Sequence, residues 1–223
     1  MLKFSGEGAI PQEKQSEEER IRQQAIEFIE KIENGSVELG AGRAGRVFSQ
    51  ENSAICVKEF NENSAQFATN SAEHELLMQR EVLELGIRGP EPMFVATSDR
   101  GVTYFVMETI KGHSIREVIE KKLDLPEAFN ISDFFTKLKG QVVVMHRGDI
   151  YHRDLHDGNV MIEWSTSNPI IIDFGFTKKN HDDGNPYLER NYPVAGNDYH
   201  FIDDLDHLKT LRKKLERYLT SRI

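Results

Sequence analysis

The sequence of 223 residues predicts an α+β fold in which antiparallel strands come first and helices follow. Short runs of β-branched and aromatic residues, bounded by turn residues, indicate strands at 37–48, 53–60, 93–96 and 102–108. Apolar residues recur at helical spacing in 16–35, 64–85, 131–146 and from 202 onward. The chain is long enough to bury a sizeable core, as one domain or as two small lobes.

Composition and charge argue against several functional classes. The net charge of -9 gives no overall positive field, so neither nucleic acid nor a membrane is expected as a partner. The single cysteine, Cys56, cannot form an internal disulfide, which fits a reducing compartment. No apolar run is long enough to span a bilayer, and residues 1–8 lack the apolar core of a secretory signal. We therefore expect a soluble, cytoplasmic protein, although a specialised secretion signal of low hydrophobicity would not be visible in this pattern.

The N-terminal region predicts a tail followed by a helix. Residues 1–15 mix Gly, Pro, Lys and Glu without periodicity and are interpreted as a flexible tail. Ser16 and Glu19 match a capping box, and Asn34-Gly35 is a stop signal, so a helix is expected over 16–35. Its apolar stripe favours packing on the small lobe, with binding of a partner as the alternative.

Three glycines stand between two predicted strands, at Gly40, Gly42 and Gly45. Glycines at this spacing let backbone amides approach phosphate oxygens closely. The pattern alone is weak and also occurs in dinucleotide-binding folds, where a helix follows it. Here a strand that carries Lys58 follows instead, which argues against a dinucleotide-binding fold.

The most informative stretch is His152-Arg153-Asp154-Leu155-His156-Asp157-Gly158-Asn159, followed by apolar residues 160–162 and then by Ile170-Ile171-Ile172-Asp173-Phe174-Gly175. Asn168-Pro169 indicates the turn of a hairpin between the two apolar runs. Asp154 would orient an acceptor hydroxyl and accept its proton, while Asn159 and Asp173 would ligate magnesium on nucleotide phosphates. The stretch therefore predicts phosphoryl transfer from a nucleotide.

These motifs resemble the catalytic loop and the Asp-Phe-Gly segment of the protein-kinase-like superfamily, and the resemblance extends from Leu39 to about Phe201. It implies a bilobal fold, with an antiparallel sheet and a helix in an N-lobe at 36–108 and a reduced helical C-lobe at 109–223. It also implies ATP and Mg²⁺ as cofactors. Lys58 would hold the nucleotide phosphates and pair with a glutamate of the helix at 64–85, where we favour Glu73 over Glu75.

The resemblance also implies an ATP pocket. Cys56 stands where protein kinases usually have alanine, Met107 would lie behind the adenine, and the backbones of Glu108 and Ile110 would meet its edge. The full set of implied ATP-binding residues is Gly40, Ala41, Gly42, Gly45, Val47, Cys56, Lys58, Met107, Glu108, Ile110, Met161 and Asp173.

The chain departs from a full protein kinase after Gly175. Residues 176–197 contain no Ala-Pro-Glu motif, and few helices can follow before the end. Asp198 resembles the aspartate that ties down the catalytic loop, and Thr177, Tyr187 and Tyr192 are candidate phosphate acceptors.

The short C-lobe is similar to minimal kinases injected by bacterial pathogens and to compact atypical kinases of tRNA modification and ribosome assembly. The residues around Asp154 look like protein kinases, whereas His156 and Gly158-Asn159 look like the aminoglycoside and choline phosphotransferases. The resemblance thus implies a minimal Ser/Thr protein kinase that acts on a protein. If the kinase is a secreted bacterial effector, that protein belongs to a host. A small-molecule kinase and a catalytically inactive nucleotide-binding scaffold are the alternatives. For His156, a contact near the γ-phosphate and a loop position facing water both remain open.

Overall fold

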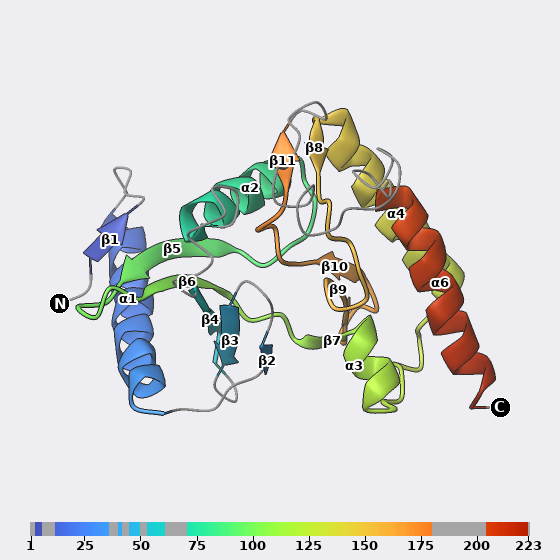
Figure 1. The fold of residues 1–223 in the computed structure, drawn as a ribbon, viewed down its shortest axis with the longest axis horizontal. Helices are drawn as coiled ribbons and strands as arrows, with labels where there is room; N and C mark the ends of the chain where they lie inside the picture. Colours follow the sequence, from blue (N-terminus) through green and yellow to red (C-terminus); the bar gives the residue numbers. More distant parts are fainter. Residues whose placement is uncertain are drawn as a thin grey trace, which may run out of the picture. The chain divides into compact units, whose positions relative to one another are not determined.

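The computed structural model describes residues 3–5, 12–35, 40–41, 45–49, 53–60, 71–179 and 204–222 (Figure 1). The chain divides into two compact units. The first consists of Met1–Arg80 and Pro90–Thr109, and the second of Glu81–Gly89 and Ile110–Ile223. The main border lies one residue from the expected one, but the second unit also takes the segment Glu81–Gly89 from the expected N-lobe.

The first unit contains a six-stranded sheet in the order β1-β5-β6-β4-β3-β2, and every neighbouring pair is antiparallel. The strands are β1 Lys3–Ser5, β2 Gly40–Ala41, β3 Gly45–Ser49, β4 Ile55–Phe60, β5 Pro92–Thr97 and β6 Thr103–Glu108. The predicted strands are confirmed where the structure describes them, and residues 37–39 and 42–44 of the predicted strand region lie outside the described residues. The additional strand β1 pairs with β5, so the expectation of a flexible tail is wrong for these three residues.

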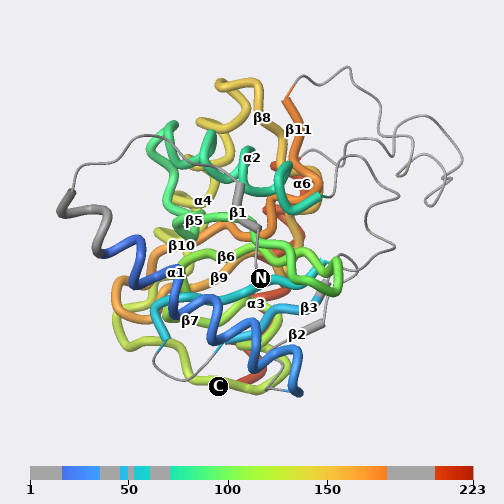
Figure 2. The backbone as a smooth tube through the Cα atoms, turned by 90° about the vertical axis from the view of Figure 1, so that its left-hand side faces the viewer, coloured from blue at the N-terminus to red at the C-terminus, as the bar shows by residue number. Residues whose placement is uncertain are grey.

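Helix α1, Gln12–Glu33, covers one face of this sheet (Figure 2). Its buried residues Phe28, Ile29 and Ile32 share an apolar cluster with Val57 of β4 and Tyr104 of β6. The helix begins four residues before the predicted capping box, because the helical pattern continues into the expected tail. Its apolar stripe packs on the sheet, which confirms the first of the two interpretations.

Helix α2, Ala72–Glu84, belongs with the opposite face of the sheet. Ala72 at its start packs with Cys56, Phe105 and Met107 in a second apolar cluster. The helix ends as predicted at Gly86, whose φ of 78° suits a residue without a Cβ. Residues 64–70 of the predicted helix lie outside the described residues.

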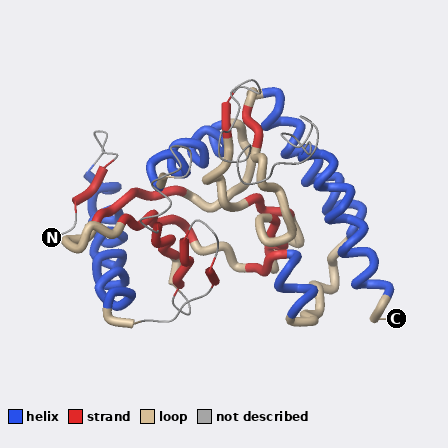
Figure 3. Tube along the Cα trace, in the orientation of Figure 1, coloured by secondary structure: helices blue, strands red, loops and turns tan. Residues whose placement is uncertain are grey.

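The second unit combines short strands with three described helices, drawn in red and blue in Figure 3. Its strands form a three-stranded sheet, β10-β9-β7, and a two-stranded pair, β11-β8. The strands are β7 Gly112–Ser114, β8 Ile150–Tyr151, β9 Val160–Glu163, β10 Pro169–Ile171 and β11 Lys178–Lys179, and the helices are α3 Ile115–Glu120, α4 Ile131–Arg147 and α6 Asp204–Thr220. The antiparallel pair of β9 and β10 confirms the predicted hairpin.

Helices α4 and α6 pack against each other and support the loop that follows α4. The α4 N-terminus is capped by Asn130, whose side chain accepts a hydrogen bond from the Asp133 N–H at 2.9 Å. Helix α6 buries Leu208, Leu211 and Leu215. None of the described helices combines the length and the apolar composition needed to cross a membrane.

Candidate active site

Lys58 forms a buried ion pair with Glu75 in the first unit. Lys58 Nζ lies 2.7 Å from Glu75 Oε2, and the two side chains are 4% and 1% exposed. The preference for Glu73 is therefore wrong. Glu73 lies on the exposed side of α2, whereas Glu75 shares the buried face with Met78 and Val82, three and seven residues further along.

The predicted adenine-side residues of the first unit gather on the sheet face that carries this ion pair. In the strand register Val47 lies opposite Lys58, and Cys56 lies opposite Met107. Since paired residues of antiparallel strands project to the same side, these four side chains share one face. The Cys56 Sγ–H donates to the Glu108 carbonyl oxygen at 3.5 Å, and burial raises the pKa of this thiol to about 12.

The glycine-rich segment is described only in part. Gly40 and Ala41 form β2 and pair with Val47 and Arg46 of β3, which begins at Gly45. Gly42 lies outside the described residues.

Three of the predicted ATP-binding residues, Ile110, Met161 and Asp173, belong to the second unit. Ile110 is buried, and Met161 is half-buried in β9. Glu108 remains in the first unit at the end of β6, where its carboxylate accepts a hydrogen bond from the Glu91 N–H at 3.0 Å.

The second unit brings Asp154 and Asn159 together. Asn159 Nδ2 donates to the Asp154 carbonyl oxygen at 2.9 Å and lies 3.4 Å from Asp154 Oδ2. The backbone N–H of Asn159 donates to the His156 carbonyl oxygen at 3.0 Å. Because its amide nitrogen is engaged, the amide oxygen of Asn159 is the atom that can bind a cation.

Asp173 follows β10 and comes directly after Ile172, which forms a hydrogen bond with Asn159. The Ile172 N–H donates to the Asn159 carbonyl oxygen at 3.0 Å. Asp173 itself has a φ of 64°, a strained conformation for a non-glycine residue of the kind that concentrates at functional sites. Two hard oxygen ligands and no softer group suit Mg²⁺, which takes its further ligands from phosphates and water. Among the described residues no group of three or more His, Cys, Asp and Glu residues could hold a metal alone.

Buried His152 connects these two segments. Its Nδ1 accepts a hydrogen bond from the Asp154 N–H at 3.3 Å, so the proton lies on Nε2, which donates to the Ile172 carbonyl oxygen at 3.1 Å. The imidazole also meets the buried Phe174 ring edge-on, with ring centroids 5.3 Å apart.

Asp204, at the start of α6, anchors the backbone of the catalytic loop. Its Oδ2 accepts from the His152 N–H at 2.9 Å, and its Oδ1 accepts from the Arg153 N–H at 3.0 Å. His146 Nε2 lies 2.9 Å from Oδ2. Burial alone would raise the pKa of Asp204, but the hydrogen bond from His146 and the two backbone N–H groups hold it below its usual value. These bonds stabilise Arg153 in its left-handed conformation, with a φ of 68°.

Asp204 thus makes the contacts expected of Asp198, and Asp198 itself lies outside the described residues. The sequence contained the signal, because Asp204 precedes Leu208, Leu211 and Leu215 at helical spacing and thus falls on the buried face.

Three other loop contacts were not predicted. His207 Nδ1 lies 2.6 Å from the Leu155 carbonyl oxygen. Asp157 is bound by Arg116 of α3 and by Lys214 of α6. Nothing in the local sequence pairs residues so far apart.

His156 and Thr177 can now be placed. His156 Nδ1 accepts a hydrogen bond from the Gly158 N–H at 3.0 Å, and Nε2 lies 3.8 Å from Asp154 Oδ2. Burial and the nearby Arg116 guanidinium lower the pKa of His156, which favours the neutral imidazole. Thr177 is fully buried, so the structure does not support it as an exposed phosphate acceptor. Tyr187 and Tyr192 lie outside the described residues.

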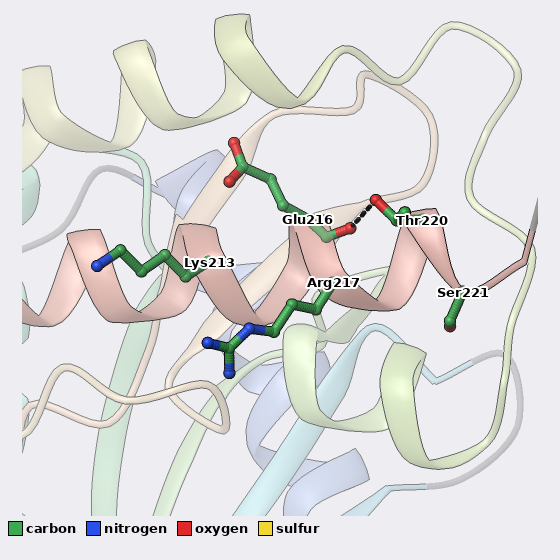
Figure 4. A pocket seen from close by; sticks show the side chains of 5 residues that line it. All are labelled: Lys213, Glu216, Arg217, Thr220 and Ser221. Carbon is green, nitrogen blue, oxygen red and sulfur yellow. Dashed lines mark hydrogen bonds between the residues drawn. The ribbon is translucent and has the colours of Figure 1, made fainter.

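A separate shallow pocket of about 430 Å³ lies on the C-terminal half of α6 (Figure 4). It is lined by Lys213, Glu216, Arg217, Thr220 and Ser221, and Thr220 Oγ1 donates to the Glu216 carbonyl oxygen at 2.9 Å. It contains none of the predicted site residues.

Comparison with known proteins agrees with the order of these motifs. The family model described as "protein kinase domain" matches residues 34–199. Serine/threonine-protein kinase PknD of Chlamydia felis is 26% identical over 141 residues, 56% of this chain and 15% of that protein. PknA of Corynebacterium glutamicum is 36% identical over 77 residues, 34% of this chain and 16% of that protein. An EKC/KEOPS complex subunit of Schizosaccharomyces pombe is 34% identical over 93 residues, 41% of this chain and 37% of that protein.

The chain therefore spans less than two fifths of the length of each of these three relatives. The family match nevertheless covers most of the chain and includes Lys58, Asp154, Asn159 and Asp173. The chain, with its α+β fold, belongs to the protein kinase family.

Proposed function

We propose that this protein is an ATP-dependent Ser/Thr protein kinase, which transfers the γ-phosphate of ATP to a hydroxyl group of a protein with the help of Mg²⁺. The similarity to bacterial serine/threonine-protein kinases supports this choice of acceptor. One observation carries the proposal further: Asn159 is fixed on Asp154 by its amide nitrogen, with its amide oxygen left for a cation.

Each residue has a distinct role in the proposed reaction. Asp154 accepts the proton of the attacking hydroxyl and orients that group. Asn159 and Asp173 hold Mg²⁺, which neutralises charge on the phosphates when it is bound. Lys58 binds phosphate oxygens, and Glu75 orients the Lys58 ammonium group through the buried 2.7 Å contact.

The remaining predicted residues would bind the nucleotide base and sugar. The glycines of 40–45 offer backbone N–H groups to the phosphates, and Val47, Cys56, Met107 and Met161 offer apolar contacts to the adenine. The backbones of Glu108 and Ile110 would recognise its edge.

The test is transfer of labelled phosphate from ATP and Mg²⁺, with wild type compared with Asp173→Ala. Loss of a charged group that stabilises the transition state should lower the rate by about 10²–10³-fold or more. Asp206→Ala is the matched control, because Asp206 is an exposed aspartate of α6 paired with Lys209, and it should retain wild-type activity. Acceptors should include generic protein substrates, bacterial lysate and eukaryotic cell lysate, because the resemblance to effector kinases implies a host protein.

Label on discrete proteins that disappears with Asp173→Ala would support the proposal. Nucleotide binding without label on any protein, or label that persists in Asp173→Ala, would contradict it. Label found only on a small molecule such as choline or an aminoglycoside would assign the alternative acceptor class.

A further inference from the structure

Asp157 is a buried carboxylate held by two cations from two different helices. Its side chain is 9% exposed. Arg116 of α3 donates to Oδ1 through Nε at 3.2 Å and through Nη2 at 3.0 Å, and Lys214 of α6 donates to Oδ2. Burial alone would raise the pKa of Asp157, but the hydrogen bonds from Lys214 and Arg116 hold it below its usual value. Both oxygens of this carboxylate are thus engaged in one fixed orientation.

Arg116 also holds the backbone at the same point. Its N–H donates to the Asp157 carbonyl oxygen at 2.9 Å. Arg116 follows directly on the start of α3, where Ser114 and Glu117 form a complete capping box. A well-formed helix terminus therefore contacts both the main chain and the side chain of Asp157.

The turn on either side of Asp157 carries His156 and Asn159, and Asn159 is one of the residues proposed to hold Mg²⁺. The Gly158 N–H donates to His156 Nδ1 at 3.0 Å, which leaves the His156 proton on Nε2. The Arg116 guanidinium lies over this turn, with Nη2 3.5 Å from His156 Nδ1. A Cβ at Gly158 would lie 2.9 Å from the imidazole and 3.1 Å from the guanidinium carbon, so the arrangement needs glycine there. Asn159 completes the turn through its bond to the His156 carbonyl oxygen.

We propose that Asp157, clamped by Arg116 and Lys214, is a positioning residue that fixes the turn 156–159 and thereby orients His156 and Asn159 at Asp154. This proposal rests on the phosphotransferase function proposed above. Asp157 touches no reacting group itself and acts through its neighbours in the turn.

Because Arg116 and Lys214 are both partly exposed, a role in positioning the turn 156–159 can be distinguished from a role in stabilising the fold. Arg116 and Lys214 are 45% and 51% exposed, and ion pairs with such solvent access contribute only about 0–1 kcal/mol to folding. A small displacement of a catalytic group, in contrast, lowers rates by about 10²-fold. Removing Lys214 should therefore affect the rate much more than the stability.

The experiment compares Lys214→Met and Asp157→Asn with Lys213→Met, which removes the adjacent exposed cation of the same helix. We expect kcat to fall about 10- to 100-fold in the first two variants, with the KM for ATP and the melting temperature close to wild type. Lys214→Arg should restore most of the rate. The double variant Asp157→Asn/Lys214→Met should be no slower than Asp157→Asn, because Asp157→Asn already removes the ion pair that Lys214→Met breaks.

A second measurement does not depend on activity. Two-bond ¹⁵N–¹H correlation spectra at neutral pH report which imidazole nitrogen carries the proton, and wild type should show His156 with the proton on Nε2. Asp157→Asn should give a mixture of both tautomers, whereas Lys213→Met should not.

Three results would overturn the proposal. The first is a wild-type rate in both Asp157→Asn and Lys214→Met, and the second is a loss of rate that follows a falling melting temperature. The third is an equal loss of rate in Lys213→Met. If wild type transfers no phosphate, the proposed function fails, and the His156 tautomer alone decides the positioning role. An unchanged tautomer in Asp157→Asn would then refute it.

Discussion

At the residue scale, the Lys58–Glu75 pair is the most buried charge contact among the described ion pairs. Taking two charges out of water costs several kcal/mol per ion, which their attraction recovers only in good geometry. Neutralising one partner leaves the other charge buried without its counterion, and such changes destabilise proteins by about 3–5 kcal/mol. The pair therefore couples the placement of Lys58, which we propose binds phosphate, to the folding of the first unit.

We predict that Glu75→Gln lowers both the phosphotransfer rate and the melting temperature. The rate should fall at least about 10²-fold, because the Lys58 ammonium group loses its orientation, and the destabilisation should lie near the range given above. Glu73→Gln is the matched control and should change neither quantity, since Glu73 is exposed on the same helix. Phosphate-transfer kinetics and thermal unfolding followed by circular dichroism measure both effects. Equal losses in the two variants would show that the pair does not have the assigned role.

The choice between these two glutamates shows where sequence reasoning stops at this scale. In the sequence, Leu76 and Leu77 stand three and four residues after Glu73, a spacing that favours Glu73 as the inward-facing carboxylate, yet Leu77 is 50% exposed. The buried face of α2 instead carries Glu75, Met78 and Gln79. Glu73 and Glu75 lie about 200° apart around a helix, more than half a turn. In a helix with weak amphipathicity the sequence pattern does not fix which of these two faces is buried. Only the packed sheet decides which rotation is adopted.

At the element scale, α1 shields one face of the sheet from water. Phe28 and Ile29 are 3% and 1% exposed and lie in the same cluster as Val57 and Val106. Burial of aromatic and aliphatic side chains contributes about 1.5–3 kcal/mol each. Helix α1 is thus an integral part of the first unit.

We predict that Phe28→Ala destabilises the protein by about 3–5 kcal/mol, because it removes a buried ring and leaves a cavity. Glu30→Ala, on the exposed side of the same helix, should change the free energy of unfolding by less than about 0.5 kcal/mol. Urea denaturation of both variants measures the difference. A loss below about 1 kcal/mol for Phe28→Ala would mean that α1 is only loosely attached.

Helix α6 illustrates a different limit of the sequence. Its leucine stripe predicted the helix, and Leu208, Leu211 and Leu215 are buried as expected. The buried face of α6 also contains one charged residue, Asp204, although buried carboxylates are rare in proteins. The Asp204 carboxylate binds the backbone N–H groups of residues 152 and 153, and a pattern of side chains cannot predict a contact with backbone groups.

At the scale of the whole molecule, the sequence predicted the order of strands, glycine-rich segment, lysine, catalytic loop and Asp-Phe-Gly segment. These features are local, since each depends on residues within one strand, turn or loop. The contacts from α6 that hold the loop join residues more than fifty positions apart, such as Asp157 to Lys214. Such pairings follow from the packed fold and could not be predicted from spacing.

Cys56 is the only cysteine of the chain and therefore a single probe of its global opening. We predict that Ellman's reagent labels it at pH 8 at least about 100-fold more slowly in the native protein than in denaturant, because the thiol is buried and its pKa is raised to about 12. A thiol pKa above the unfolded value of about 8.5 adds stability at low pH that is lost as pH rises towards 12. The unfolding free energy of wild type should thus fall more steeply above pH 9 than that of Cys56→Ala. If the native protein were labelled as fast as the denatured protein, Cys56 would not be buried in the native sheet.

The anchors on α6 also have a consequence for how the protein is made. Ribosomes add about 5–20 residues per second, and segments can pair only after both have emerged. The backbone of 152–153 is complete well before Asp204 exists, and Asp157 well before Lys214. During synthesis, the catalytic loop therefore lacks its contacts with Asp204 and Lys214 at a stage when the sheet of the first unit can already form. The loop 152–159 therefore acquires its full set of anchors late in synthesis, after Asp204 and Lys214 have left the ribosome.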